Sequence, residues 1–448
     1  MIWMFLHLDK GKIKMKNKTL WKTKADIIGL NTRPLRVVMI GDSFLPHVDG
    51  VIRVMQNYIE QFQQKNIEFL ILAPAYTNYD LDEDNKLTYK PMRIKPSLIK
   101  WGGYEVIRTP LHINELKQID QFNPDIVHVH SPFFAGSIAN QLKKRYNIPV
   151  VFTMHTNFKD AIAKSSNSAM IGKIGELVVQ QFAKSVDCVI HVSKTSMLSS
   201  GFNLLNSRHE IINNGTKFNF DTNSESLAQQ AINKFKINKN KNNLLFVSRF
   251  VWEKNIKLLL DSFKQILAKD NNFSLTMVGG NWKEDEVKKY AHELGIYDHI
   301  IWTGLVYDFN DLKGLYLSHD LFVFPSVFDT FGLVVHEAAS QKLASLVISN
   351  SAASENIIDG VNGYTSTENS TEFSNKIIEI FKNKTQLKLV GQNATKLPYS
   401  WSQSVDKTIE LYIDVIKNYY TKNREKRLQK MAIKIRNKFS GAFKKINK

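Results

Sequence analysis

The sequence predicts an α/β protein made of two successive doubly wound domains, each built on a parallel sheet. The first observation is length, because 448 residues exceed one typical domain. The second is that short, continuously apolar runs alternate with amphipathic segments, as in parallel sheets that helices cover on both faces. The third is that this alternation stops and then starts again, which divides the chain in two.

The first half contains five expected strands, and segments such as 51–64 and 135–146 between them have helical periodicity. These strands lie in the apolar runs RVVMIGD, FLILAP, DIVHVHS, PVVFTMH and VDCVIHVS. Residues 78–109 are the least regular part of this half, and we expect long loops there.

The second half repeats the pattern with the runs NLLFVSRF, FSLTMVGG, HIIWTGLV, LFVFPS and SLVISN. A polar stretch near residues 217–242 is expected to link the two halves, and residues 402–420 form a strongly amphipathic helix that we expect at the end of the second domain. The expected organisation is a basic leader (1–34), a first domain (35–217), a second domain (218–400), a C-terminal helix (401–420) and a basic tail (421–448).

Composition indicates a soluble globular protein, with 43% hydrophobic and 23% charged residues. The single cysteine, Cys188, excludes an intrachain disulfide, fits a reducing compartment and is expected to be a buried structural thiol. No apolar run reaches the roughly 18–20 residues that cross a bilayer. The opening MIWMFLHL lacks a preceding positive region and a cleavage site, so it is a poor signal peptide.

The net charge of +18 belongs mainly to the two ends of the chain. Residues 1–34 carry eight Lys/Arg against two Asp/Glu, and residues 421–448 carry eleven against one, so the rest holds only +2. Because the body has no basic patch or known binding motif, a nucleic-acid partner is not expected.

Loops that follow strands are the places to look for chemistry, because doubly wound sheets bind ligands at the carboxyl ends of their strands. Gly50 lies where the first such loop turns into a helix, and it would let backbone N–H groups approach a phosphate. Taken alone, this glycine could equally serve only to bend the chain.

Three histidines follow or lie within the third and fourth expected strands. His155 ends a strand and could donate a hydrogen bond to a reacting sugar, although a histidine in such a place is usually structural. His128 and His130 lie on one strand face, but no acidic or cysteine partner is near them in the sequence, so no metal site is predicted.

Two loops of the second half carry charged residues. Arg249 and Lys254 could clamp a diphosphate, or they could be ordinary surface cations next to Glu253. In DTFGLVVHE, Thr330 could cap a helix, and Gly332 would permit close approach of the backbone to a ligand. The carboxylates of Asp329 and Glu337 could accept hydrogen bonds from sugar hydroxyls.

Together, the segments DGV, MHTNF, SRFVWEKN, FVFPSVFDTFGLVVHEA and SENIIDGVNGY resemble glycosyltransferase family 4, over roughly residues 35–420. The resemblance implies a GT-B fold, in which two Rossmann-like domains face each other across a cleft. Its most specific element is the pair of acids eight positions apart. The sequence is most similar to the subgroup that glycosylates diacylglycerol and phosphatidylinositol.

The resemblance also implies roles for the residues singled out above. Asp329 and His155 would act at the donor sugar, Glu337 would hold the ribose of the nucleotide, and Gly50 would lie near phosphate. Arg249 and Lys254 would bind the diphosphate, and the N–H groups of Phe331, Gly332 and Leu333 would lie against sugar and phosphate. Family members typically retain the anomeric configuration and need no divalent metal. This chain departs from the family pattern at Asp329, where glutamate is common, and at Asp49, where a second glycine is often found.

In the tail, apolar residues recur every three or four positions among lysines and arginines, as in a helix that lies on an anionic membrane; a solvated tail or a helix docked on the protein is the alternative. The stripe consists of Leu428, Met431, Ile435, Phe439, Ala442, Phe443 and Ile446.

These observations lead to one expectation: a cytoplasmic hexosyltransferase, peripheral on the inner membrane face, that uses a UDP- or GDP-sugar as co-substrate and no cofactor. Its acceptor would be a hydroxyl of a lipid or lipid-linked saccharide. Two alternatives remain open, namely an enzyme for lipopolysaccharide or capsular glycan, and an inactive membrane-associated scaffold that binds a nucleotide sugar.

Overall fold

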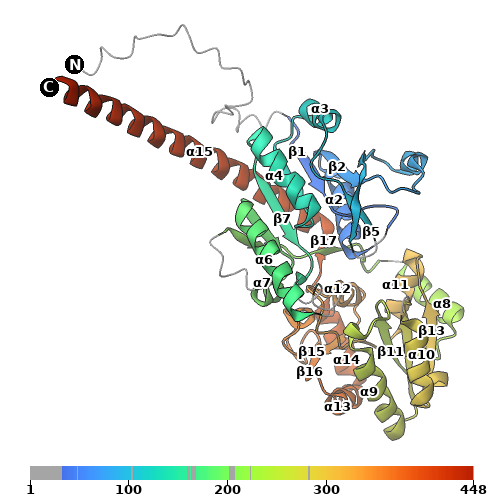
Figure 1. Cartoon of the computed structure of the whole chain (residues 1–448). Coiled ribbons are helices and arrows are strands. Elements are labelled where there is room, and N and C mark those ends of the chain that lie inside the picture. The colour runs from blue at the N-terminus through green and yellow to red at the C-terminus, as the bar shows by residue number, and fades with distance from the viewer. Residues whose placement is uncertain are drawn as a thin grey trace.

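The computed structural model describes residues 33–446 except 48, 102–103, 159–161, 163–167, 201–206, 222 and 281–282. The expected basic leader therefore lies almost wholly outside the described residues. Two sheets dominate the architecture, and helices cover both faces of each (Figure 1).

The first sheet has seven strands in the order β3-β2-β1-β6-β7-β8-β9, and every neighbouring pair is parallel. The strands are β1 (Arg36–Ile40), β2 (Glu68–Pro74), β3 (Met92–Ile94), β6 (Ile126–Val129), β7 (Val150–Met154), β8 (Cys188–His191) and β9 (His209–Ile211). The helices of this domain are α2 (Gly50–Gln64), α3 (Ile113–Phe122), α4 (Phe134–Tyr146), α6 (Ala169–Ser185) and α7 (Lys194–Ser199).

The second sheet has six parallel strands in the order β13-β12-β11-β14-β15-β16. The strands are β11 (Asn242–Val247), β12 (Phe273–Val278), β13 (Ile300–Gly304), β14 (Leu321–Phe324), β15 (Ser345–Ile348) and β16 (Tyr364–Ser366). The helices are α8 (Ser224–Phe235), α9 (Ile256–Lys269), α10 (Glu284–Glu293), α11 (Phe309–Ser318), α12 (Leu333–Ser340), α13 (Ser370–Phe381) and α14 (Lys384–Ala394).

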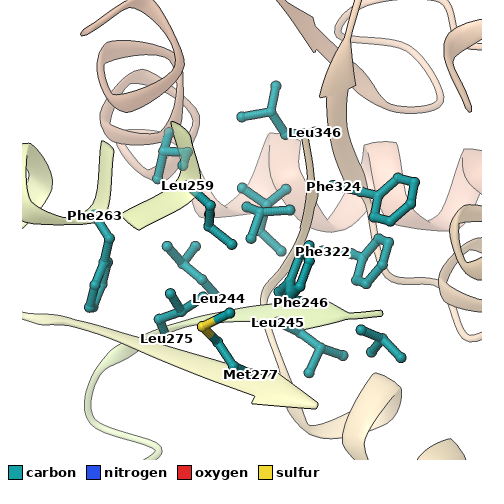
Figure 2. Close-up of a cluster of buried hydrophobic side chains, with 14 of the residues drawn as sticks. Leu244, Leu245, Phe246, Leu259, Phe263, Leu275, Met277, Phe322, Phe324 and Leu346 are labelled. Atoms are coloured by element: carbon teal, nitrogen blue, oxygen red, sulfur yellow. The ribbon is translucent and has the colours of Figure 1, made fainter. Parts of the chain in front are cut away.

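The strands are continuously apolar because both faces of each sheet are buried. In β1, Val38 and Ile40 belong to the core on one face, whereas Val37 and Met39 belong to the core on the other. Figure 2 shows the corresponding core of the second domain, where side chains from β11, β12, β14 and β15 pack against Leu259 and Phe263 of α9. Cys188 is buried and forms no disulfide, as expected.

Residues 78–109 contain more regular structure than the expected long loops. They hold a 3-10 helix (Leu81–Lys86), the edge strand β3 and the antiparallel hairpin of β4 (Pro96–Trp101) and β5 (Tyr104–Ile107). These elements are too short to produce a clear period in the sequence.

The expected linker at 217–242 is also different in the structure, because it contains α8 and the start of β11. Ala231 and Ile232 of α8 are buried, and Phe218 already belongs to the core of the second domain. Residues 217–242 resemble a linker in sequence because α8 buries only a narrow stripe of side chains, and the rest of its surface is polar.

The C-terminal helix α15 (Trp401–Ile446) follows the second domain in sequence but packs on the first. Its buried residues join the core beside α2, where the hydroxyl of Tyr58 lies 2.9 Å from Thr408 Oγ1 and the rings of Tyr58 and Trp401 are 6.0 Å apart. This corrects the expectation that the helix completes the second domain. The chain therefore crosses between domains twice, and the crossings meet where β10 (Gly215–Thr216) pairs with β17 (Tyr399–Ser400).

Beyond the first domain, α15 continues as one projecting helix (Figure 1). The side chains of residues 426–448, which carry the predicted apolar stripe, lie outside the described part of the structure. Among the described residues, no helix combines the length and apolar character needed to cross a membrane.

Candidate functional site

A cavity of about 580 Å³ lies between the two domains, at the carboxyl ends of their strands. Residues from both domains line it, and they include every predicted site residue except Glu337. The lining residues are Asp49, Gly50, Val51, Val54, His155, Thr156, Asn214, Arg249, Val251, Lys254, Asp329, Thr330, Phe331, Gly332 and Leu333.

The first turn of α2 forms part of the cavity wall on the first domain. Asp49 caps this helix, because its carboxylate accepts a hydrogen bond from the N–H of Ile52 at 2.8 Å. Gly50 is the first helical residue, and a Cβ atom built there would have no atom within 4 Å. Protein packing therefore does not require this glycine, and its absent side chain leaves the helix N-terminus open to a ligand.

His155 follows directly after β7 and is half-buried in the cavity wall. Its Nε2 atom lies 2.9 Å from Nδ1 of His130, which follows β6. Burial lowers the pKa of His155 to about 4, so the ring is neutral near pH 7.

On the second domain, a short 3-10 helix (Trp252–Lys254) follows β11 and carries one of the two predicted cations. Nζ of Lys254 lies 2.6 Å from Oδ1 of Asp329, and both side chains are mostly buried. The other carboxylate oxygen, Oδ2 of Asp329, is buried and has no hydrogen-bond partner within the described structure. A ligand hydroxyl could satisfy this acceptor.

Arg249, the second predicted cation, is exposed in the loop before this 3-10 helix and lines the cavity. No ion pair or hydrogen bond of its guanidinium occurs among the described residues. An Arg and a Lys on one loop place a planar donor group and a compact charge at the same wall, which suits a diphosphate.

The backbone at the start of α12 also faces the cavity. Gly332 has a φ of +73°, and a Cβ atom there would lie 2.9 Å from Cβ of Ala353, so both conformation and space require glycine. Within the described structure, the N–H groups of Phe331, Gly332 and Leu333 have no acceptor. These donors at a helix N-terminus form an anion-binding arrangement.

We expected Thr330 to cap α12, but Gly332 occupies the N-cap position. Instead, the Thr330 hydroxyl donates to the backbone oxygen of His155 at 2.7 Å, and the Thr330 backbone oxygen accepts from the hydroxyl of Ser193 at 2.6 Å. Since His155 and Ser193 belong to the first domain, Thr330 joins the two domains at the cavity edge.

Glu337 is the predicted residue that the structure does not bring to the cavity wall. It lies on α12, and its Oε2 accepts a hydrogen bond from the hydroxyl of Tyr316 at 2.8 Å. Burial raises the pKa of Glu337, whereas the Tyr316 hydrogen bond and nearby Arg53 act in the opposite direction.

Sequence reasoning missed several groups at this site. Asn214 and Thr156 line the cavity, and Glu355 joins the domains by accepting from the N–H groups of Lys194 at 2.9 Å and Thr195 at 2.7 Å. Glu355 stands in the quoted segment SENIIDGVNGY, but nothing in that segment indicates its partner in the other domain.

Two family models match the chain, one in each half. The model described as Glycosyltransferase Family 4 matches residues 48–216, and the model described as Glycosyl transferases group 1 matches residues 228–397. Between them they span the elements that form both walls of the cavity.

The chain is similar to curated proteins over most of its length. It is 22% identical over 405 residues to an alpha-monoglucosyldiacylglycerol synthase of Acholeplasma laidlawii, a match that covers 85% of this chain and 98% of the relative. It is 23% identical over 340 residues to a GDP-mannose-dependent alpha-mannosyltransferase of Corynebacterium glutamicum, covering 74% and 76% of the two chains.

Solved structures share the same architecture. The structure of Anabaena Alr3699/HepE in complex with UDP and glucose has a TM-score of 0.64 and 17% identity, and the match covers 84% of this chain and 98% of that chain. At this identity the likeness concerns the fold, and it confirms the expected GT-B arrangement of two doubly wound domains.

Proposed function

Because the two halves of this chain belong to glycosyltransferase family 4 and the group 1 glycosyl transferases, we propose that it transfers a hexose from a nucleotide diphosphate sugar to a lipid hydroxyl. The observation that carries this proposal is the cavity between the domains. It combines two cations, three free backbone N–H groups and a carboxylate oxygen without a partner among the described residues.

The diphosphate of the donor binds Arg249, Lys254 and the N–H groups at the start of α12. Negative charge grows on the leaving diphosphate as the bond to the sugar breaks, and these donors are positioned before the reaction to stabilise it. Because the protein supplies this positive charge itself, the proposed reaction needs no divalent cation and no cofactor.

Asp329 and His155 hold the donor sugar from opposite walls. The free Oδ2 of Asp329 accepts a hydrogen bond from a sugar hydroxyl, while the neutral ring of His155 can donate one. Glu337 accepts hydrogen bonds from the nucleotide ribose after a small movement of its side chain, which now contacts Tyr316. Retention is supported by the names of both relatives, which specify alpha products, because common UDP- and GDP-hexoses also carry the sugar in alpha linkage.

A lipid acceptor is supported by an apolar face on α6 as well as by the diacylglycerol in the name of one relative. The chain reaches α6 soon after leaving the cavity at His155. Five residues of this helix are each at least 46% exposed, and their spacing places them on one side: Met170, Ile171, Ile174, Leu177 and Val178. An exposed apolar face of this kind suits contact with acyl chains.

Membrane attachment at the cytoplasmic face is the second part of the proposal. It rests on the +10 charge of residues 421–448 and on the continuous helix that carries them to Ile446. Anionic lipid attracts such a segment, and its apolar stripe would lie in the interface.

The proposal is tested by incubating purified protein with UDP-glucose and GDP-mannose and with diacylglycerol in mixed micelles. Formation of a hexosyl lipid is the expected result. Transfer only to a water-soluble glycan would contradict the lipid acceptor, and binding of donor without transfer or hydrolysis would indicate the inactive scaffold. The matched variant Leu177→Lys on α6 should lower transfer to diacylglycerol without changing donor hydrolysis.

A further inference from the structure

His130 and His155 form a hydrogen-bonded pair at the ends of two neighbouring strands. Nδ1 of His130 and Nε2 of His155 are 2.9 Å apart, and the rings are nearly parallel, at 10°. His130 is 1% exposed, and its backbone N–H donates to the oxygen of Ile40 at 2.8 Å. It therefore lies behind His155, away from solvent and fixed to the sheet.

Both rings are neutral near pH 7, because burial lowers the pKa of His155 to about 4 and that of His130 well below its ordinary value. A neutral imidazole has one N–H donor and one acceptor nitrogen. The pair can therefore have two arrangements, in which either Nδ1 of His130 or Nε2 of His155 carries the shared proton.

The second nitrogen of His130 distinguishes these arrangements. Nε2 of His130 is buried and has no hydrogen-bond partner within the described structure. If His155 donated to His130, this atom would be a buried N–H without an acceptor, which is rare and costly. If His130 donates instead, the atom is only an unused lone pair, so this arrangement is favoured.

We propose that His130 is a positioning residue that donates from Nδ1 to His155 and so leaves the N–H of His155 on Nδ1, available to the donor sugar in the cavity. Nδ1 of His155 makes no hydrogen bond in the described structure, and it is the one polar side-chain atom of His155 that His130 does not use. The inference rests on the proposed function, since it assigns His155 the part of a hydrogen-bond donor to that ligand. A partner that selects the tautomer of a functional histidine acts through that histidine and not on the substrate.

His128 provides a matched control, since it lies two residues away on the same strand face and is also fully buried. Its hydrogen bonds go to Thr153 Oγ1 at 2.6 Å and to the hydroxyl of Tyr412 at 2.5 Å, and not to a residue that lines the cavity. Loss of His128 should therefore disturb the core without changing the tautomer of His155.

The first test is the nitrogen NMR spectrum of the histidine rings in the full-length wild-type protein near pH 7. It should show His155 protonated on Nδ1, and assignment uses the signal that His155→Gln removes. Protonation of His155 on Nε2 would overturn the inference without the need for any variant at position 130.

The second test compares three variants in sugar transfer. His130→Leu should lower kcat by about tenfold or more, with a smaller effect on KM for the donor, because His155 loses its fixed tautomer and orientation. His130→Asn should recover most of that loss, because its amide nitrogen occupies nearly the place of Nδ1. His128→Leu should lower stability but keep the wild-type kcat and the Nδ1 tautomer.

Equal kcat in wild type and His130→Leu, or equal losses in His130→Leu and His130→Asn, would overturn the inference. Failure of the wild-type protein to transfer from any nucleotide sugar would instead overturn the proposed function. The two failures are thus distinguishable.

Discussion

Lys254 and Asp329 form an ion pair of 2.6 Å that joins the loop after β11 to the loop after β14. The sequence suggests separate tasks for them, one at the diphosphate and one at the sugar. In the structure their side chains contact each other directly, and this contact holds both beside the cavity. A change at either residue should therefore affect the other.

Lys254→Ala should lower kcat/KM for the donor by about a hundredfold or more, because it removes charge stabilisation of the leaving diphosphate and leaves Asp329 unpaired. The control is Lys257→Ala, which breaks a pair with Asp261 on the outer surface of α9. Steady-state kinetics should show near wild-type values for the control. Wild-type kinetics in Lys254→Ala itself would show that this loop does not bind the donor.

Glu337→Ala should lower kcat/KM by roughly 30- to 150-fold, the effect of losing charged hydrogen bonds to the ribose. Tyr316→Phe tests the observed contact, because it removes the hydroxyl that donates a hydrogen bond to Glu337 and leaves the carboxylate in place. Calorimetry should show a smaller loss of nucleotide affinity in Tyr316→Phe than in Glu337→Ala. If Glu337→Ala binds nucleotide as well as wild type does, Glu337 has no part in the donor site.

EDTA should leave the transfer rate essentially unchanged, since Arg249, Lys254 and the α12 amides supply the positive charge at the diphosphate. The measurement compares initial rates with and without the chelator at saturating donor. A complete loss of activity that magnesium or manganese restores would refute metal independence.

Stability should fall as the pH drops from about 6.5 towards 4. Six histidines have a strongly lowered pKa in the folded state, chiefly because burial disfavours their charged form: His128 and His191 to about 3, His155, His319 and His336 to about 4, and His130 to well below its usual range. In this window the unfolded chain binds protons that the folded chain excludes, so each histidine can remove up to about 1.4 kcal/mol of unfolding free energy per pH unit.

Asp42 acts in the opposite sense, because burial raises its pKa to about 6 and the folded state takes up its proton first. Histidines outnumber it, so the net effect should be destabilising. Urea unfolding at pH 5 should therefore have a lower midpoint than at pH 7. Equal midpoints would mean that these histidines are solvated or paired in solution.

Truncation after Thr421 should abolish binding to anionic vesicles and preserve the fold and donor binding. The buried part of α15 ends before this point, since Val415 and Ile416 belong to the core and Tyr420 packs against it. Flotation of the full-length protein should weaken with salt, because the attraction is screened over roughly 8–10 Å at physiological ionic strength. Some binding should survive through the apolar stripe, and equal flotation of the two chains would show that the tail does not bind lipid.

The sequence was sufficient to predict the fold because strands buried on both faces leave continuous apolar runs. It was insufficient for β3, β9 and β16, since three residues are too few to show a pattern. It also misplaced α15, because amphipathicity shows that a helix has an apolar face and not which surface covers that face.

The site was predictable where chemistry follows a strand directly, as at His155 and Arg249, because the topology brings such loops to one edge. Contacts between distant segments were not predictable. The bond from Thr330 to His155 and the bond from Tyr316 to Glu337 depend on how two domains and two helices pack. Neither leaves a local sequence signal.

The return of α15 to the first domain decides which part of the enzyme stays in place when the chain is tethered. The end of this helix is anchored in the first domain, which also carries the α6 face. The second domain is connected to the first by the paired crossings at Thr216 and Ser400. A tether at the C-terminus would thus hold the first domain at the lipid surface as a fixed base. The second domain would be held on this base by the paired crossings and by the contacts of Thr330 and Glu355 with the first domain.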